Sequence, residues 1–190
     1  MKKDKELVKR LKRVYGLAVL LMLLSISAIA NAVSPGMDEY AVKAAFVLNF
    51  ARYTQWPEES FASPAEPFTL CVLGNKTIKS AFQELNGKKI NDRTLDVHFM
   101  HKSKDVGQCD MMFIGKGVDP VLLLDILAAV KDKPVLTIGE TKAFINDGGI
   151  INFFSRTGRL HFEINVIIAR KNHLKLSSRL LKLAILVGEK

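Results

Sequence analysis

Two residues on one predicted strand have side chains of types that bind metal ions. His161 and Glu163 are two positions apart in RLHFEIN, residues 159–165, so they share one face of a strand. Imidazole and carboxylate groups are zinc ligands, but a zinc site needs at least three protein ligands. No third candidate lies nearby in the sequence. We therefore predict a half-exposed strand face and no metal site, with a metallohydrolase as the alternative.

The turns that follow the predicted strands lack the glycine patterns of nucleotide sites. VLGNKTI, residues 72–78, has one glycine, and the two glycines of FIGKG, residues 113–117, match no phosphate-binding fingerprint. The sequence also has no G-x-S-x-G nucleophile elbow and no paired-carboxylate motif. We predict that the protein is not an enzyme and has no catalytic residues and no cofactor.

The first 32 residues have the pattern of a secretory signal peptide. A basic segment precedes an apolar run of 16 residues, Val14–Ile29, and residues 30–32 read ANA, an A-x-A cleavage site. The run is shorter than the roughly 20 residues of a spanning helix. We predict cleavage after Ala32 and a periplasmic product, residues 33–190, that forms a single domain. An uncleaved signal anchor is the alternative.

Removal of this signal changes the charge of the protein. Seven of the 28 Lys and Arg residues and two of the 19 Asp and Glu residues precede Val33. The mature chain keeps 21 basic and 17 acidic residues, so its net charge is +4, whereas the full chain has +9. Much of the basic excess that would suggest a nucleic-acid partner therefore belongs to the export signal. We expect no nucleic-acid binding.

The two cysteines, Cys71 and Cys109, each lie on a predicted buried strand. In a doubly wound sheet with strand order 2-1-3, these strands would be neighbours. An exported protein folds in an oxidising compartment, where disulfides persist. Closing such a loop would stabilise the fold by about 4 kcal/mol in the chain-entropy model. We predict a structural disulfide, with two buried free thiols as the alternative.

Strand and helix patterns alternate along the mature chain. Strands are predicted at 68–74, 93–100, 109–115, 134–139, 150–155 and 159–165. Helices are predicted at 39–56, 77–87 and 119–132, a short helix and turn at 141–149, and two more helices after Asn165. The last helix should carry Leu180 and Val187 on one face, and Asp119, Asn165 and Ser177 or Ser178 are expected caps. This order predicts a three-layer α/β/α sandwich around a mostly parallel sheet, with a C-terminal antiparallel hairpin.

The first predicted helix of the domain is apolar almost all round. Such a helix is buried on more than one side, either between layers of its own domain or against a partner. Lys43 interrupts its apolar surface. We expect the Lys43 amine to extend along the helix to water, and an ion pair with an acid is the alternative.

Several ordered segments resemble the YfiR family. They are YAVKAAFVLNFARYTQWP, CVLG, CDMMFIG, LTIGETKAFINDGGIINFF, GRLHFEIN and SSRLLKLA, and together they cover about Tyr40 to Val187. The resemblance implies a periplasmic α/β domain in which Cys71 and Cys109 occupy the positions of a family disulfide. It also implies that Phe162, Glu163, Ile164 and Asn165 belong to the functional C-terminal region that binds a partner. A second cysteine pair around FINDGGIINF is missing here, so a redox switch that depends on it is in doubt.

The resemblance also implies partners. The expected partner is an inner-membrane diguanylate cyclase of the YfiN type, which the regulator represses, and an outer-membrane lipoprotein, YfiB, would draw the regulator away. A homodimer is implied as well. The function expected from the sequence is negative regulation of this cyclase, which lowers cyclic di-GMP and biofilm formation. The alternative is a periplasmic small-molecule-binding module that uses the crevice at the strand ends.

Overall fold

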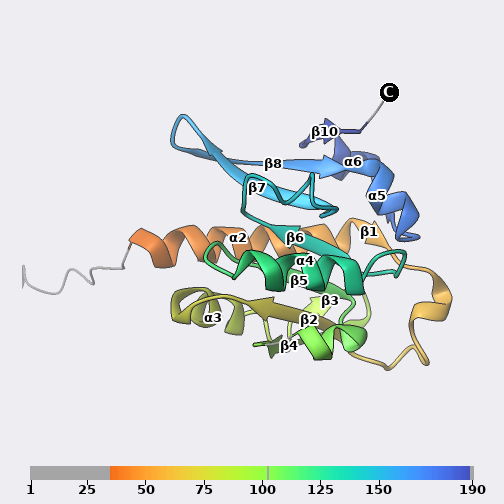
Figure 1. Ribbon diagram of the computed structural model, residues 1–190. Coiled ribbons are helices and arrows are strands. Elements are labelled where there is room, and N and C mark those ends of the chain that lie inside the picture. Colours follow the sequence, from red (N-terminus) through yellow and green to blue (C-terminus); the bar gives the residue numbers. More distant parts are fainter. Residues whose placement is uncertain (1–34, 102, 189–190) are drawn as a thin grey trace, which may run out of the picture. The chain divides into compact units, whose positions relative to one another are not determined.

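The computed structural model describes residues 35–101 and 103–188, and the predicted signal peptide, residues 1–32, lies outside them. An eight-stranded sheet has the order β10-β8-β7-β6-β5-β2-β4-β3 (Figure 1). Its strands are β2 Phe68–Leu73, β3 Lys89–Ile90, β4 Arg93–Phe99, β5 Met111–Ile114, β6 Leu136–Gly139, β7 Ile151–Arg156, β8 Arg159–Asn165 and β10 Ile185–Val187. All neighbouring pairs are parallel except β7–β8 and β3–β4. The mostly parallel sheet and its C-terminal hairpin are therefore confirmed.

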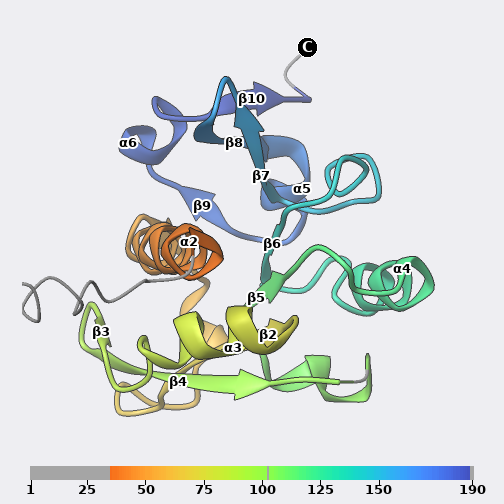
Figure 2. The same ribbon diagram turned by 90° about the vertical axis from the view of Figure 1, so that its left-hand side faces the viewer.

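Helices cover both faces of the sheet, as Figure 2 shows in an end-on view. They are α2 Pro35–Arg52, α3 Lys76–Gln83, α4 Pro120–Ala129, α5 Val166–Lys171 and α6 Ser178–Leu181, with short 3-10 turns η2 Glu58–Ser60 and η3 Ser103–Gln108. One hydrophobic cluster joins α2 and α3 to one face, and a second joins α4 to the other. The predicted three layers are thus present.

The centre of the sheet is buried because its strands are nearly continuous apolar runs. All four residues of β5 are buried, as are five of the six in β2, which is the pattern of parallel strands covered by helices on both faces. The apolar face of α2 packs onto the C-terminal hairpin. The Phe50 ring lies 5.5 Å from that of Phe153 and 4.9 Å from that of Phe162. Helix α2 is therefore a core helix of its own domain.

The helix starts follow the predicted capping residues. The Asp119 carboxylate accepts hydrogen bonds from the backbone N–H groups of Val121 and Leu122. Asn165 caps α5 and Ser177 caps α6 in the same way. These side chains satisfy N–H groups that have no partner within the first helical turn.

Three predicted helices differ from the structure. The first ends at Arg52, and β1 Thr54–Gln55 then pairs with β9 Lys175–Leu176. The predicted helix at 141–149 is a series of turns, in which a Cβ atom on Gly149 would lie 2.1 Å from the Phe144 ring. The last predicted helix stops at Leu181, and Ile185–Val187 add to the sheet as β10. Its apolar spacing suited a helix, but its branched residues also suit a strand.

Candidate functional site

The predicted partner-binding residues lie on β8, between β7 and β10. Phe162 and Ile164 are buried in the core beneath α2. On the opposite face Glu163 is half-buried, and its Oε1 accepts a hydrogen bond from Asn152 Nδ2 at 3.0 Å. Asn165 caps α5 through the N–H of Ile168. Of the four residues, Glu163 is therefore the one that can meet a partner without unpacking the core or uncapping a helix.

The two possible metal ligands on the polar face of β8, His161 and Glu163, each have a local partner. His161 is half-buried and stacks on Phe154, with ring centroids 5.6 Å apart. Among the residues that the structure describes, no group of three or more His, Cys, Asp or Glu side chains could hold a metal ion. His161 and Glu163 therefore have local structural partners, Phe154 and Asn152.

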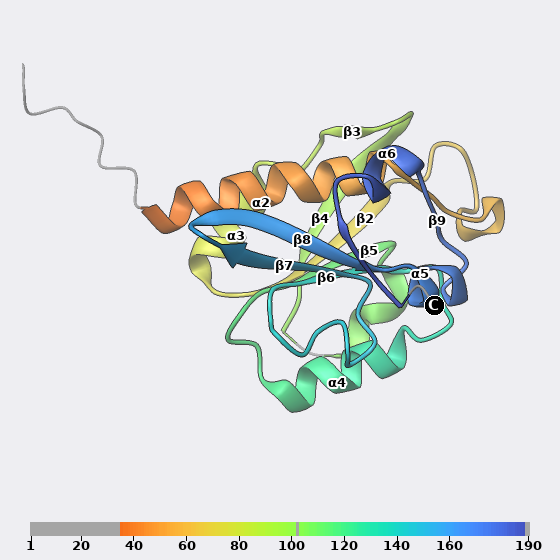
Figure 3. The ribbon, with the colours of Figure 1, turned by 90° about the horizontal axis from the view of Figure 1, so that it is seen from above.

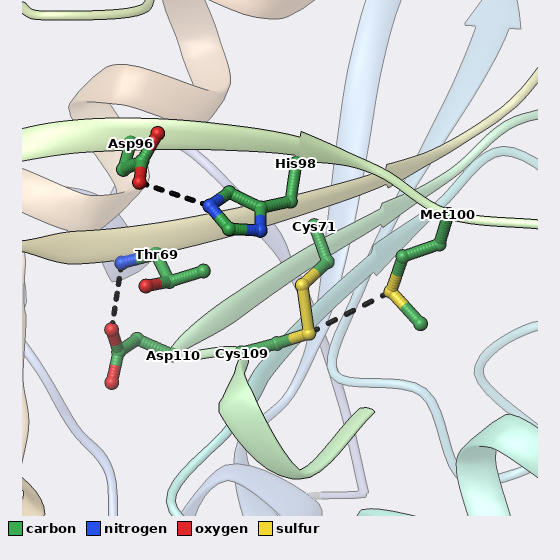
Figure 4. Close-up of a disulfide and its surroundings, with 7 residues drawn as sticks. All are labelled: Thr69, Cys71, Asp96, His98, Met100, Cys109 and Asp110. Atoms are coloured by element: carbon green, nitrogen blue, oxygen red, sulfur yellow. Dashed lines mark hydrogen bonds and ion pairs between the residues drawn. A yellow bond between two sulfur atoms is a disulfide. The ribbon is translucent and has the colours of Figure 1, made fainter. Parts of the chain in front are cut away.

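A disulfide joins Cys71 to Cys109, with 5.7 Å between the two Cα atoms (Figure 4). Cys71 is in β2 and Cys109 precedes β5, and β2 lies between β4 and β5 as the predicted strand order requires. Both cysteines are buried, and the Met100 sulfur lies 3.7 Å from that of Cys109. The prediction of a bonded pair is confirmed, and the alternative of two free thiols is excluded.

Asp110, next to this disulfide, has a half-buried carboxyl group and directly precedes β5. Its Oδ2 accepts a hydrogen bond from the Thr69 N–H at 2.7 Å (Figure 4). The indole N–H of Trp56 donates to the Asp110 backbone carbonyl at 3.2 Å. Burial raises the pKa of Asp110 to about 6, although the Thr69 hydrogen bond acts in the opposite direction. Asp110 therefore titrates well above the ordinary range of an aspartate.

Lys43 does not reach water, so the expectation of an extended side chain is wrong. It is buried and forms ion pairs with Glu140, which follows β6, and with Glu39. Glu140 Oε1 also accepts hydrogen bonds from the Tyr40 hydroxyl at 2.9 Å and from the Lys116 N–H at 2.7 Å. Burial, and then the charge of Glu140, raises the pKa of Tyr40. The cluster fastens α2 to the carboxyl ends of β5 and β6.

Only part of this buried cluster could be inferred from the sequence. Lys43 gave a signal because a charge inside an apolar helix needs a partner. Glu140 stands directly after a predicted strand, where side chains at the sheet edge converge. The sequence did not indicate that these two positions, 97 residues apart, meet.

The strand-end crevice is small and open. A groove of about 390 Å³ lies between the turns after β2 and β5, bordered by Gly74, Asn75, His101 and Lys116 among others. The glycines in these turns have a packing role, because a Cβ atom on Gly115 would lie 2.3 Å from Ile78. A Cβ atom on Gly74, the single glycine of VLGNKTI, would lie 2.6 Å from Ile78, so this glycine allows close packing of α3.

A larger hollow of about 530 Å³ lies at the other end of β2. Trp56, Phe61 and Phe68 line it, and the Trp56 and Phe68 rings meet edge to face with centroids 4.7 Å apart. The Arg93 guanidinium lies 3.8 Å above the Phe61 ring and donates to the backbone carbonyls of Ser63 and Glu66. The volume of this hollow is in the range of small-molecule pockets.

The end of the sheet at β10 carries exposed apolar residues. Its exposed side chains are Ile167 (42 %), Leu183 (72 %), Ile185 (47 %) and Leu186 (36 %), and we call this set the β10 edge. Figures 1 and 3 show α5, α6 and β10 gathered at this end. Residues 150–188 contain seven Lys and Arg residues and one acidic residue, Glu163. The sequence pattern predicted a strand and two helices here, with the last helix running through Val187, so the open edge at β10 was not expected.

The fold defines an α/β sandwich with helices on both faces of a mostly parallel sheet. The chain belongs to the YfiR/HmsC-like family, DUF4154, whose model matches residues 40–185. This is a family of regulators and not of enzymes. No helix in the described ranges has both the length and the apolar character needed to cross a membrane.

Two further comparisons add little. No curated protein matches the chain significantly. A solved structure, an ABC domain in complex with L-Trp from Streptococcus pneumonia, is 10 % identical with a TM-score of 0.49. The match covers 76 % of this chain and 60 % of that one. A likeness at this level carries no argument about function.

Proposed function

We propose that this protein is a periplasmic negative regulator that binds the periplasmic part of an inner-membrane diguanylate cyclase. Binding lowers cyclic di-GMP and so disfavours biofilm. The family match over residues 40–185 is the observation that carries this proposal. An outer-membrane lipoprotein of the YfiB type would compete for the regulator, and the regulator would act as a homodimer.

Repression needs no chemistry from the regulator. A cyclase that exchanges between an active and an inactive state is shifted by any ligand that binds the inactive state more tightly. The size of the shift equals the difference between the two binding free energies. Shifting a cyclase from mostly active to mostly inactive therefore requires a large contact surface with few but specific anchors.

Glu163 is the residue of β8 that we place in this contact. Its carboxylate is half-buried beside β10, because Ile185 is the register partner of Glu163. One of its oxygens, Oε1, accepts from Asn152, and a carboxylate can accept several hydrogen bonds. An N–H donor of the partner can therefore bind there while Phe162 and Ile164 remain in the core.

Replacing Glu163 by Ala tests this contact. We expect Glu163→Ala to remain folded, with a change in unfolding free energy of about 1 kcal/mol from the lost Asn152 hydrogen bond. Repression should weaken, which an increase in cellular cyclic di-GMP would report. Glu84→Ala, at an exposed position after α3, is the matched control and should repress normally. Normal repression by a folded Glu163→Ala variant would contradict this contact and leave Glu163 only its structural role as the acceptor of the Asn152 hydrogen bond.

A deletion strain tests the function as a whole. Loss of the gene should raise cyclic di-GMP, and the full chain should restore the low level. A chain without residues 2–32 should not, because the proposed contact is in the periplasm. Restoration by this unexported chain would contradict the proposal, as would a deletion without effect on cyclic di-GMP.

The hollow beside Trp56 favours a second candidate, a small-molecule-binding module. It combines three aromatic rings with polar groups at its border, a combination that suits a planar aromatic ligand. A thermal-shift screen with amino acids and aromatic compounds tests it. A stabilising compound whose binding perturbs Trp56 fluorescence would support the candidate, and a screen without such a compound would count against it.

A further inference from the structure

The sheet of this protein has two free edges of opposite character. At one end β3 lies beside Lys88, Lys89, Asn91 and Asp92, all exposed. Charged side chains on an edge strand prevent it from pairing with another chain. At the other end β10 reads Ile-Leu-Val and carries no charge. Strand β3 covers only Arg93 and Thr94 of β4, and the remainder of that edge carries Asp96 and His98. Of the two ends, the β10 end therefore has the edge strand without charged side chains.

The free edge at this end is longer than β10. Strand β10 pairs only with Glu163–Asn165 of β8, so Arg159–Phe162 of β8 have β7 as their single neighbour among the described strands. Ile185 and Leu186 are adjacent in β10, so their side chains point to opposite faces of the sheet. Both are exposed. An added strand would find apolar contacts on either face.

The part of the chain that forms this end of the sheet, residues 150–188, carries seven cations. They are Arg156, Arg159, Arg170, Lys171, Lys175, Arg179 and Lys182, and all are exposed. None forms a salt bridge with a described residue. In contrast, residues 33–149 carry 13 basic and 15 acidic residues. Positive charge is therefore concentrated in the segment that contains β8 and β10, where it favours acidic partners.

We propose that the β10 edge binds an extended, acid-flanked segment of a partner protein by strand addition. Main-chain hydrogen bonds to the free edge would provide affinity. Apolar side chains at neighbouring positions would contact Ile185 on one face of the sheet and Leu186 on the other. Asp or Glu residues at the ends of the segment would meet Arg159 and Lys182. This inference rests on the proposed function, since it assigns the segment to the periplasmic part of the cyclase.

Two other occupants fit the edge less well. Pairing with the β10 edge of a second copy would bring the two sets of cations together, which is unfavourable. A homodimer would therefore use another face. Anionic lipid would match the charge, but an open sheet edge in hydrocarbon leaves its N–H and C=O groups without partners. A protein strand satisfies both the charge and the backbone.

Two short synthetic peptides test the inference without the cyclase. Both have the same alternating Val and Thr core, and one is flanked by Glu and the other by Lys. The acidic peptide should shift the backbone amide resonances of Ile185–Val187 in the isotope-labelled mature chain and slow their hydrogen exchange. Its affinity should fall as salt is raised. The Lys-flanked peptide should bind at least about tenfold more weakly.

Matched variants locate the site. Ile185→Asp should abolish binding of the acidic peptide, whereas Val121→Asp, at an exposed position on α4, should not. The double variant Arg159→Glu with Lys182→Glu changes only exposed residues and should reverse the preference between the two peptides. It keeps the test decisive if Ile185→Asp does not fold.

Several results would overturn the inference. Equal binding of both peptides, or no binding of the acidic peptide, would be such a result, as would resonance shifts at residues away from β10. Binding of phosphatidylglycerol vesicles instead of the acidic peptide would point to a membrane surface, and self-association that protects the β10 amides would point to a second copy of the chain. Its failure is separable from failure of the proposed function. Peptide binding without repression would count against the function, and repression by Ile185→Asp despite lost peptide binding would count against this inference.

Discussion

Asp110 shows how burial of one carboxyl group makes the stability of the protein depend on pH. Its pKa of about 6 exceeds the ordinary value of 3.8 because the group is half-buried. Between these two values the folded protein binds the proton more often than the unfolded chain does. The unfolding free energy therefore falls as pH rises through this window, and the loss is complete above the folded pKa.

Removing the charge should recover this stability. We predict that Asp110→Asn is more stable than the wild type at pH 7, by at most about 2 kcal/mol, because Asn can still accept from the Thr69 N–H. The variant should lose the fall in stability between pH 4 and 6, which urea unfolding at several pH values would measure. Asp125→Asn, exposed on α4, should keep the wild-type profile. A steeper fall in Asp110→Asn would refute this account.

The buried ion pair of Lys43 and Glu140 leads to a second prediction. Removing one member leaves the other charge buried without its partner, which costs about 3–5 kcal/mol. We expect this loss for Glu140→Ala, measured by urea unfolding. Glu39 also pairs with Lys43 but is 47 % exposed, so Glu39→Ala should cost no more than about 1 kcal/mol. Equal losses of unfolding free energy in Glu140→Ala and Glu39→Ala would contradict the claim that burial makes the Lys43–Glu140 pair the stronger of the two.

At the scale of elements, local signals in the sequence predicted most of the sheet. Continuous apolar runs identified β2, β5 and β6, and alternation identified β4 and β8, because these strands have the burial that their patterns require. Asp119, Asn165 and Ser177 marked helix starts through side-chain chemistry that depends on nearby residues alone.

The elements that were missed depend on distant residues. Thr54–Gln55 became β1 because β9 lies beside them, 121 residues later along the chain. The apolar spacing from Leu180 to Val187 fits a helix, but in the structure Ile185–Val187 pair with β8 and form β10. Lys43 needed an acid, but only the folded chain brings Glu140 to it. The disulfide and strand β8 were therefore predicted from the sequence, whereas the β10 edge was not.

The disulfide acts between two elements, β2 and the start of β5. We predict that the double variant Cys71→Ser with Cys109→Ser loses up to about 4 kcal/mol of unfolding free energy, seen as a lower melting temperature. Partner binding should persist wherever the variant is folded, because both cysteines are buried and away from the β10 edge. Reductant should lower the melting temperature of the wild type alone. Lost binding by a folded variant would indicate a switch.

At the scale of the whole molecule, the stabilising contacts and the proposed binding edge lie in different parts of the chain. The buried ion cluster and the disulfide stabilise the carboxyl ends and the centre of the parallel sheet. The C-terminal residues 150–188 instead carry seven of the cations and the open β10 edge. This distribution suits a regulator that presents one end of a rigid sheet to its partner, because partner contact there leaves the core unchanged.

Reconstitution of the cyclase tests the central claim most directly. A full-length diguanylate cyclase of the YfiN type from the same cell would be placed in lipid nanodiscs, and its conversion of GTP to cyclic di-GMP would be measured as the mature chain is added. We predict a saturable fall in product formation, and no fall with a heat-unfolded chain at the same concentrations. A cyclase rate that stays constant in the presence of the folded chain would contradict the account.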